Sequence, residues 1–145
     1  MRFWDASALV PLLVGETSTA GLLDLLSSDA DVLVCWGAAV ECVSAVARRE
    51  RDGLLSGTEA QRALDKLRAL ADAWQEVLPS GVVRATAQRL LRVHPLRAAD
   101  GLQLAAALVA AEGEPHLLEF VCLDARLNEA ARREGLRVLP DQGLS

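Results

Sequence analysis

Lysine is almost absent from this sequence, because Lys66 is the one lysine among 15 basic residues and all the others are arginines. Lys66 falls in the middle of a helical pattern, which argues against a phosphate-receiver domain, since that domain needs a lysine at the end of a late strand. Aromatic residues make up only 3% of the chain. Leucine, valine and alanine must therefore fill its core.

Several catalytic motifs are also missing. The sequence has no glycine-rich loop of the kind that cradles nucleotide phosphates. A phosphoaspartate phosphatase would carry a second aspartate two residues after Asp5, where Ser7 stands. The two histidines, His94 and His116, each adjoin a proline in a predicted loop and have no carboxylate at an informative spacing, so we expect both at the surface. A metal-free nuclease that uses a histidine pair is therefore not favoured.

The net charge of −5 argues against a general nucleic-acid coat protein, which would be basic. It leaves a nuclease open, because bound divalent cations can face the phosphate. Three cysteines among apolar neighbours predict reduced, buried thiols and a cytoplasmic protein. Asp5 and Pro11 interrupt the first apolar run, so no secretory signal is expected. No apolar run approaches the roughly 20 residues that span a bilayer, so we expect no membrane association.

Short apolar runs that suit strands alternate with longer segments of helical spacing. The predicted strands are Arg2–Trp4, Val32–Trp36, Glu76–Leu78, Leu118–Leu123 and Leu136–Leu139. The predicted helices are Ser7–Val14, Thr19–Leu26, Ala38–Arg51, Thr58–Trp74, Val82–Val93, Arg97–Ala111 and Ala125–Glu134. This alternation indicates an α/β fold with a mostly parallel sheet and helices on both faces. A length of 145 residues fits one domain, residues 1–145.

Four acidic residues fall in apolar settings near the start of predicted helices: Asp5, Glu41, Asp100 and Asp124. Asp5 and Asp124 each follow a strand and precede a helix, which places them at the carboxyl edge of the sheet, where ligands bind in such folds. Burying an unpaired Glu41 or Asp100 would be costly. If the four carboxylates meet, they form an all-oxygen pocket that selects Mg²⁺ or Mn²⁺, ions that activate water and stabilise charge on a phosphodiester.

Each acid also has a purely structural interpretation. The three aspartates could simply cap helices, and Glu41 could pair with Arg48 on its own helix or with an arginine from another. Arg48 and Arg97 lie near the predicted site in the sequence and could contact phosphates. They could equally be solvated helix-end residues that pair with neighbouring acids. The residues alone leave both interpretations open.

Four blocks of the sequence match a known family in this order and spacing: FWDASALV, VECVSAVARRE, LRAADGLQLAAAL and FVCLDARLNEAARREGLRVL. Together they resemble PIN-domain ribonucleases and, within them, the VapC-like toxins of bacterial toxin–antitoxin pairs. The resemblance runs through almost the whole chain. It implies a PIN-like three-layer sandwich with a sheet of about five strands, and an endoribonuclease that hydrolyses RNA phosphodiesters.

The resemblance also implies roles for individual residues. The four acids singled out above become the catalytic and metal-binding groups, with Asp5 and Asp100 as direct ligands and the other two binding directly or through water. Ser7 stands where the family often has a hydroxyl that helps to shape the site. Cys122 is a departure, because serine or threonine is common two residues before the last acid. If that hydroxyl orients Asp124, its loss would weaken a second metal site.

Cofactor and partners follow from the same resemblance. It implies Mg²⁺ or Mn²⁺, single-stranded or loop RNA as substrate, a homodimer, and a cognate antitoxin that wraps the toxin and often blocks its site with an arginine. The helices Thr19–Leu26 and Thr58–Trp74 could form the antitoxin groove, although they could equally be core or homodimer surface. Two alternatives are an inactive PIN-like module that binds a partner protein, which the presence of all four acids disfavours, and a PIN ribonuclease that processes RNA without an antitoxin.

Overall fold

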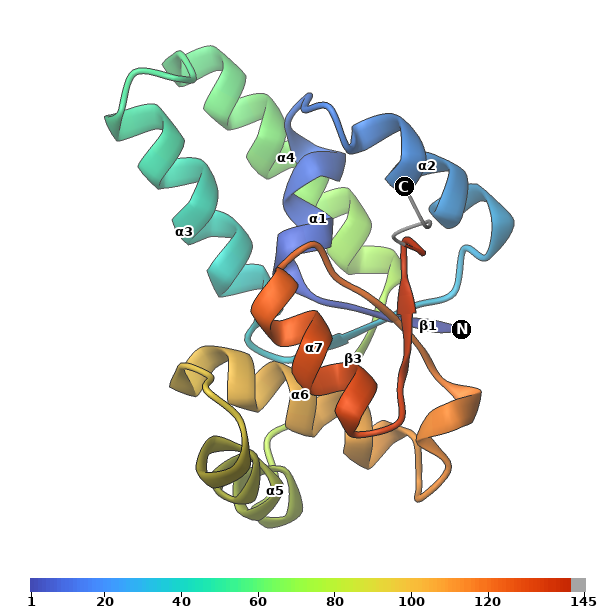
Figure 1. The fold of residues 1–145 in the computed structure, drawn as a ribbon. Coiled ribbons are helices and arrows are strands. Elements are labelled where there is room, and N and C mark those ends of the chain that lie inside the picture. The colour runs from blue at the N-terminus through green and yellow to red at the C-terminus, as the bar shows by residue number, and fades with distance from the viewer. Residues whose placement is uncertain (142–145) are drawn as a thin grey trace.

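The computed structural model describes residues 1–141, which form an α/β fold around one sheet (Figure 1). The strands are β1 (Arg2–Trp4), β2 (Val32–Cys35), β3 (Gln75–Val77), β4 (Glu119–Val121) and β5 (Arg137–Leu139). Their order is β3-β2-β1-β4-β5, and every neighbouring pair is parallel. The prediction of a mostly parallel sheet of about five strands is confirmed.

Helices connect successive strands, as parallel pairing requires. They are α1 (Ala6–Leu13), α2 (Thr19–Ser28), α3 (Ala38–Arg51), α4 (Gly57–Ala73), α5 (Gly81–Val93), α6 (Ala98–Ala110), the short 3-10 helix η1 (Pro115–Leu117) and α7 (Ala125–Arg133). Within residues 1–141, none of these helices has the length and apolar character needed to cross a bilayer.

Alternate residues of the central strands point to opposite faces of the sheet. Phe3 and Phe120 stack with ring centroids 5.6 Å apart and belong to the core beneath α5, α6 and α7. Their chain neighbours Trp4 and Val121 belong to the core beneath α1, α2, α3 and α4. Figure 1 shows these first four helices gathered on one side of the sheet and α5 and α6 on the other. The predicted three-layer arrangement is therefore confirmed.

The helix α4 illustrates how local sequence fixes an element. Ser56 accepts a hydrogen bond from the backbone N–H of Glu59, and the Glu59 side chain accepts one from the backbone N–H of Ser56, which is a complete capping box. The buried side chains Ala60, Ala63 and Leu67 follow at helical spacing. The helix therefore begins at Gly57, one residue before its predicted start at Thr58.

Strand β4 is shorter than predicted, because it ends at Val121 and not at Leu123. The residues that follow turn toward β1: the backbone N–H of Leu123 donates to the hydroxyl of Ser7 at 2.9 Å. The backbone of Leu123 thus bonds to a side chain and not to a neighbouring strand, so the strand does not extend to it.

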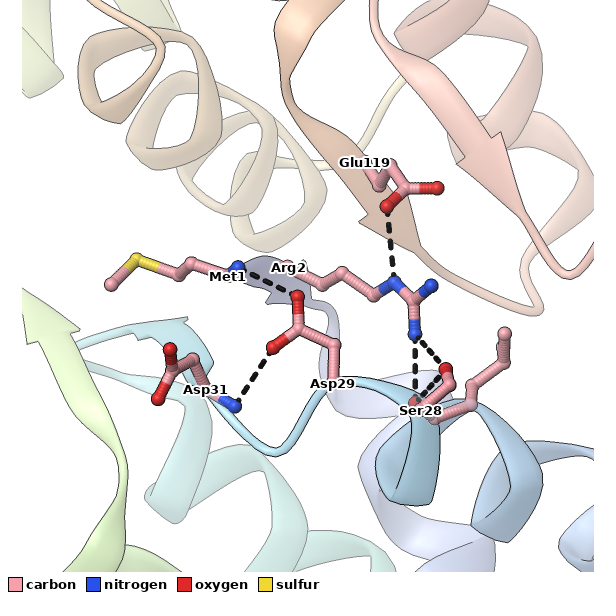
Figure 2. Close-up of polar contacts among 7 residues, drawn as sticks. Met1, Arg2, Ser28, Asp29, Asp31 and Glu119 are labelled. Atoms are coloured by element: carbon pink, nitrogen blue, oxygen red, sulfur yellow. Dashed lines mark hydrogen bonds and ion pairs between the residues drawn. The ribbon is translucent and has the colours of Figure 1, made fainter.

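Arg2 ties together the amino-terminal edge of the sheet (Figure 2). Its Nη1 atom donates to the carbonyl oxygen of Leu25 and to the hydroxyl of Ser28, both at 2.7 Å. Its Nε atom donates to the carboxylate of Glu119 at 3.2 Å. One guanidinium thus joins β1, β4 and the last turn of α2, where a cation also complements the helix dipole.

One surface prediction is wrong. His94 is only 6% exposed, and its Nε2 atom lies 2.7 Å from the carboxylate of Glu134, which also accepts from Arg89 at 2.9 Å. The hydrogen bond from Arg89 lowers the pKa of Glu134 below its ordinary value. These contacts join the end of α5 to the end of α7. His116, in contrast, is exposed as predicted.

Candidate active site

A cleft of about 850 Å³ opens at the carboxyl edge of the central strands. The beginnings of α1, α6 and α7 line it together with one side of α3. Three of the four predicted acids, Glu41, Asp100 and Asp124, belong to this lining. The cleft therefore collects groups from the first, second, third and fourth sequence blocks, which are far apart along the chain.

Asp5 lies beneath this cleft. This residue is 4% exposed, while its neighbours Ala6 and Ser7 line the cleft. It caps α1, because its Oδ2 atom accepts from the backbone N–H of Ser7 at 3.0 Å. Burial raises the pKa of Asp5, against hydrogen bonds that lower it. A buried carboxylate of this kind is costly unless a cation or donor compensates its charge.

Asp124 occupies the equivalent position after β4. Its Oδ1 atom accepts from the backbone N–H of Leu127 at 2.9 Å and so caps α7. The structural interpretation of Asp124 as a helix cap is therefore realised. The cap uses one carboxylate oxygen, and the hydrogen bonds found within residues 1–141 leave the other oxygen free for a ligand.

Ser7 and Cys122 join the ends of β1 and β4. The hydroxyl of Ser7 lies 3.5 Å from the sulfur of Cys122 as well as accepting from Leu123. The thiol lies 3.6 Å from the Oδ2 atom of Asp5 and accepts from the backbone N–H of Asp124 at 3.4 Å. Burial raises the pKa of the Cys122 thiol. This thiol therefore stands where the family commonly has a hydroxyl and still contacts both acid-bearing loops.

Glu41 is held by a residue that the sequence analysis missed. The side-chain amide of Gln103, which is fully buried on α6, donates to the Oε1 atom of Glu41 at 2.7 Å. Glu41 thus pairs with Gln103, and not with Arg48 as the structural interpretation suggested. Burial is the main cause that raises the pKa of Glu41, and the charges of Asp5 and Asp100 add to it. A single polar residue in the apolar run LQLAAAL was the available signal.

Asp100 lies in the first turn of α6, and Arg97 is the N-cap residue, so Asp100 does not cap this helix. Burial raises the pKa of Asp100, and the negative charges of Asp124 and Asp5 raise it further. The charge of Asp5 thus acts on both Glu41 and Asp100, and the charge of Asp124 acts on Asp100. Within residues 1–141, however, no three histidine, cysteine, aspartate or glutamate side chains stand close enough to ligate one ion.

Arginines also line the cleft. The predicted Arg48 and Arg97 both belong to the lining, as does Arg126, which the sequence analysis did not single out. Arg49 also lines the cleft, but it is paired with Glu16 at 2.9 Å. Within the part of the chain that the structure describes, the other three make no ion pair. The cleft thus offers acids that can hold a cation and free guanidinium groups that can face an anion.

Taken together, the sheet order, the two helical layers and the acid-lined cleft define an α/β domain of the PIN-like class. Two ribonucleases of Mycobacterium tuberculosis are similar to the chain: Ribonuclease VapC45 of strain CDC 1551 / Oshkosh and Ribonuclease VapC49 of strain ATCC 25618 / H37Rv. Each is 36% identical over 146 residues, which cover 97% of this chain and 95% of the relative. The chain belongs to the VapC ribonuclease family, and the resemblance seen in its sequence is confirmed. No family model matches the chain.

Solved structures show the same fold. The crystal structure of FitAcB from Neisseria gonorrhoeae has a TM-score of 0.66 with 19% identity and covers 95% of this chain and 96% of that chain. The structure of FitAB bound to an IR36 DNA fragment has a TM-score of 0.65 with 17% identity, covering 95% and 93% of the two chains. These likenesses confirm the predicted PIN-like fold.

Proposed function

We propose that this chain is an endoribonuclease that depends on a divalent metal and is the toxin of a toxin–antitoxin pair. The observation that carries the proposal is the gathering of Glu41, Asp100 and Asp124 around one cleft with Asp5 buried beneath it. Membership of the VapC ribonuclease family supports the same activity.

The donor set fits a hard divalent cation. All four side chains are carboxylates, which is the chemistry that Mg²⁺ and Mn²⁺ prefer. Asp5 and Asp100 would hold the ion directly, and Glu41 and Asp124 directly or through water. Two direct carboxylate ligands would be enough for Mg²⁺, since this ion usually keeps several waters and takes one or two protein carboxylates. When bound, the ion would activate a water molecule and stabilise the charge that develops on the phosphodiester.

The arginines of the cleft can bind the phosphates of RNA, which the acids repel. RNA must approach a protein of net charge −5 across a group of carboxylates. Arg48 and Arg97 present guanidinium groups in the cleft lining, where each can make paired hydrogen bonds to a phosphate. Such contacts position the RNA backbone, while unpaired bases in single-stranded or loop regions remain accessible for recognition.

An antitoxin and a second copy of the chain are the proposed protein partners. The helices suggested for the antitoxin groove contribute to the core, because Leu22 in α2 and Leu67 in α4 are buried. Large exposed apolar side chains occur near β2 and β3, among them Trp36, Val40 and Leu78. Trp36 and Leu78 follow paired strands, so they lie near each other. This apolar area supports a protein interface, and light scattering on the purified chain would measure its oligomeric state.

The first test is cleavage of a mixed RNA pool with Mg²⁺, with Mn²⁺ and with a chelator. We compare the natural protein with Asp5→Asn and Asp100→Asn, and with Asp65→Asn as a matched control on the exposed face of α4. The expected result is metal-dependent cleavage that the first two substitutions abolish and the control retains. If the natural protein cuts no RNA, or if both site variants cut as fast as it does, the proposal is wrong and a partner-binding module becomes the better interpretation.

A further inference from the structure

Gln103 is an unusual residue for its position. Its side chain is fully buried on α6 in a helix whose other buried side chains are small or apolar. It lies three residues after Asp100, which places both side chains on the same side of the helix. An apolar side chain would suit such a position, so the presence of an amide calls for a reason.

Only the nitrogen of this side-chain amide has a hydrogen-bond partner in the part of the chain that the structure describes. The Nε2 atom of Gln103 donates to the Oε1 atom of Glu41 at 2.7 Å. The Oε1 atom of Gln103 is buried and, within residues 1–141, has no hydrogen-bond partner. Burying an unpaired polar atom lowers stability. The hydrogen bond to Glu41 is therefore what the chain gains from keeping glutamine here.

This hydrogen bond connects two parts of the cleft. Glu41 comes from α3, while Gln103 and Asp100 share the first turns of α6. Glu41 is a long side chain with several rotamers, and it lines an open cleft. The buried amide fixes one of its carboxylate oxygens relative to the helix that carries Asp100.

We propose that Gln103 is a positioning residue that holds the carboxylate of Glu41 at a set spacing from Asp100, so that both can serve one divalent cation. This inference rests on the proposed function, because it assumes that Glu41 takes part in metal binding. Groups that support a metal ligand in this way commonly change metal affinity by about 10–100-fold when they are removed.

The test measures Mn²⁺ affinity by titration calorimetry and does not depend on cleavage. Gln103→Met keeps the length of the side chain and removes the donor. We expect its dissociation constant for Mn²⁺ to rise about tenfold or more, while its thermal midpoint stays the same or rises, since the unpaired buried oxygen is gone. Gln61→Met is the matched control, because Gln61 makes a similar amide-to-carboxylate bond to Asp65 on the exposed surface of α4. This control should bind Mn²⁺ like the natural protein.

Two more variants separate positioning from general structural damage. Gln103→Asn keeps the amide but is too short to reach Glu41, and it should lose Mn²⁺ affinity as Gln103→Met does. In a Glu41→Gln background, Gln103→Met should cause no further loss of Mn²⁺ affinity, because the group that it positions is already changed. A structural defect would lower the affinity equally in both backgrounds.

The outcomes distinguish this inference from the function on which it rests. If Glu41→Gln weakens Mn²⁺ binding but the folded Gln103→Met or Gln103→Asn variant binds it like the natural protein, the role of Gln103 is refuted and the metal site stands. The same holds if Gln103→Met weakens binding equally with and without Glu41. If Glu41→Gln itself binds Mn²⁺ and cuts RNA normally, Glu41 is not a ligand and both this inference and that part of the proposed site fail.

Discussion

The thiol of Cys122 lies 3.6 Å from the carboxylate of Asp5, although these residues are 117 positions apart in the chain. The contact forms because β1 and β4 are parallel neighbours whose ends lie side by side. A buried thiol is a weak hydrogen-bond donor. The thiol of Cys122 therefore stabilises the buried carboxylate of Asp5 less than a hydroxyl would.

This contact predicts how substitutions of Cys122 change the site. Cys122→Val removes the donor, and we expect it to weaken Mn²⁺ binding about tenfold. Cys122→Ser supplies a stronger donor that also suits Ser7, so it should bind Mn²⁺ at least as tightly as the natural protein. Calorimetric titration of both variants, with thermal unfolding as the check on folding, measures the difference. Weaker binding by Cys122→Ser than by Cys122→Val would contradict the prediction.

The metal-free protein is expected to lose stability as pH rises toward neutral. Asp5, Glu41 and Asp100 all have pKa values raised above their ordinary values of 3.8, 4.5 and 3.8, chiefly by burial. Between these values and the raised ones, these three groups bind more protons in the folded state than in the unfolded state. The free energy of unfolding therefore falls as pH rises through this interval. A bound cation should offset the loss, so the increase in thermal midpoint that Mn²⁺ causes should be larger at pH 7 than at pH 4.

Asp5→Asn tests whether the buried charge of Asp5 lowers the stability of the metal-free protein. Asparagine caps helices about as well as aspartate, so the start of α1 keeps its hydrogen bond. The substitution removes a buried charge, and we expect a higher thermal midpoint at pH 7 without metal. A gain of about 1 kcal/mol would raise the midpoint by roughly 3 °C in a domain of this size. The variant should also show a flatter dependence of stability on pH. A lower midpoint at pH 7 would show that Asp5 stabilises the fold as an ion.

Arg97 is predicted to act on RNA and not on the metal. Arg97→Ala should weaken RNA binding and reduce the salt dependence of binding by about 0.7 per lost phosphate contact on a single strand. Mn²⁺ affinity should not fall, because the charge of Arg97 acts on Asp100 and its removal favours a cation there. Binding is measured by fluorescence anisotropy at several salt concentrations in an Asp100→Asn background, which prevents cleavage. Arg133→Ala is the control, because Arg133 pairs with Glu129 on an exposed face of α7. Equal losses in both variants would indicate a general effect of charge.

Local sequence was enough to predict most elements. The apolar pattern predicted the bounds of α3 and α6 within a residue, and the pattern of strand, acid and helix placed Asp5 and Asp124 at one edge of the sheet. Because the carboxyl ends of parallel strands share one edge of the sheet, residues that follow these strands lie close together. The existence of the cleft follows from these local signals and the usual handedness of the crossovers.

The pairings inside the site could not be predicted in this way. Gln103 meets Glu41 across 62 positions, and His94 meets Glu134 across 40. Neither pair has a periodic signal, because each contact depends on how two helices pack. The one clue was a polar residue in an apolar segment, which indicates a buried partner without saying which residue it is.

The two edges of the sheet differ in how their charged groups are compensated. At the amino edge, one guanidinium satisfies acceptors from a strand and a helix. At the carboxyl edge, carboxylates repel one another and resist burial. A collection of random variants should therefore divide into two groups. Substitutions at the amino edge would lower the amount of folded protein in the cell, and substitutions of the acids would yield abundant protein that cuts no RNA.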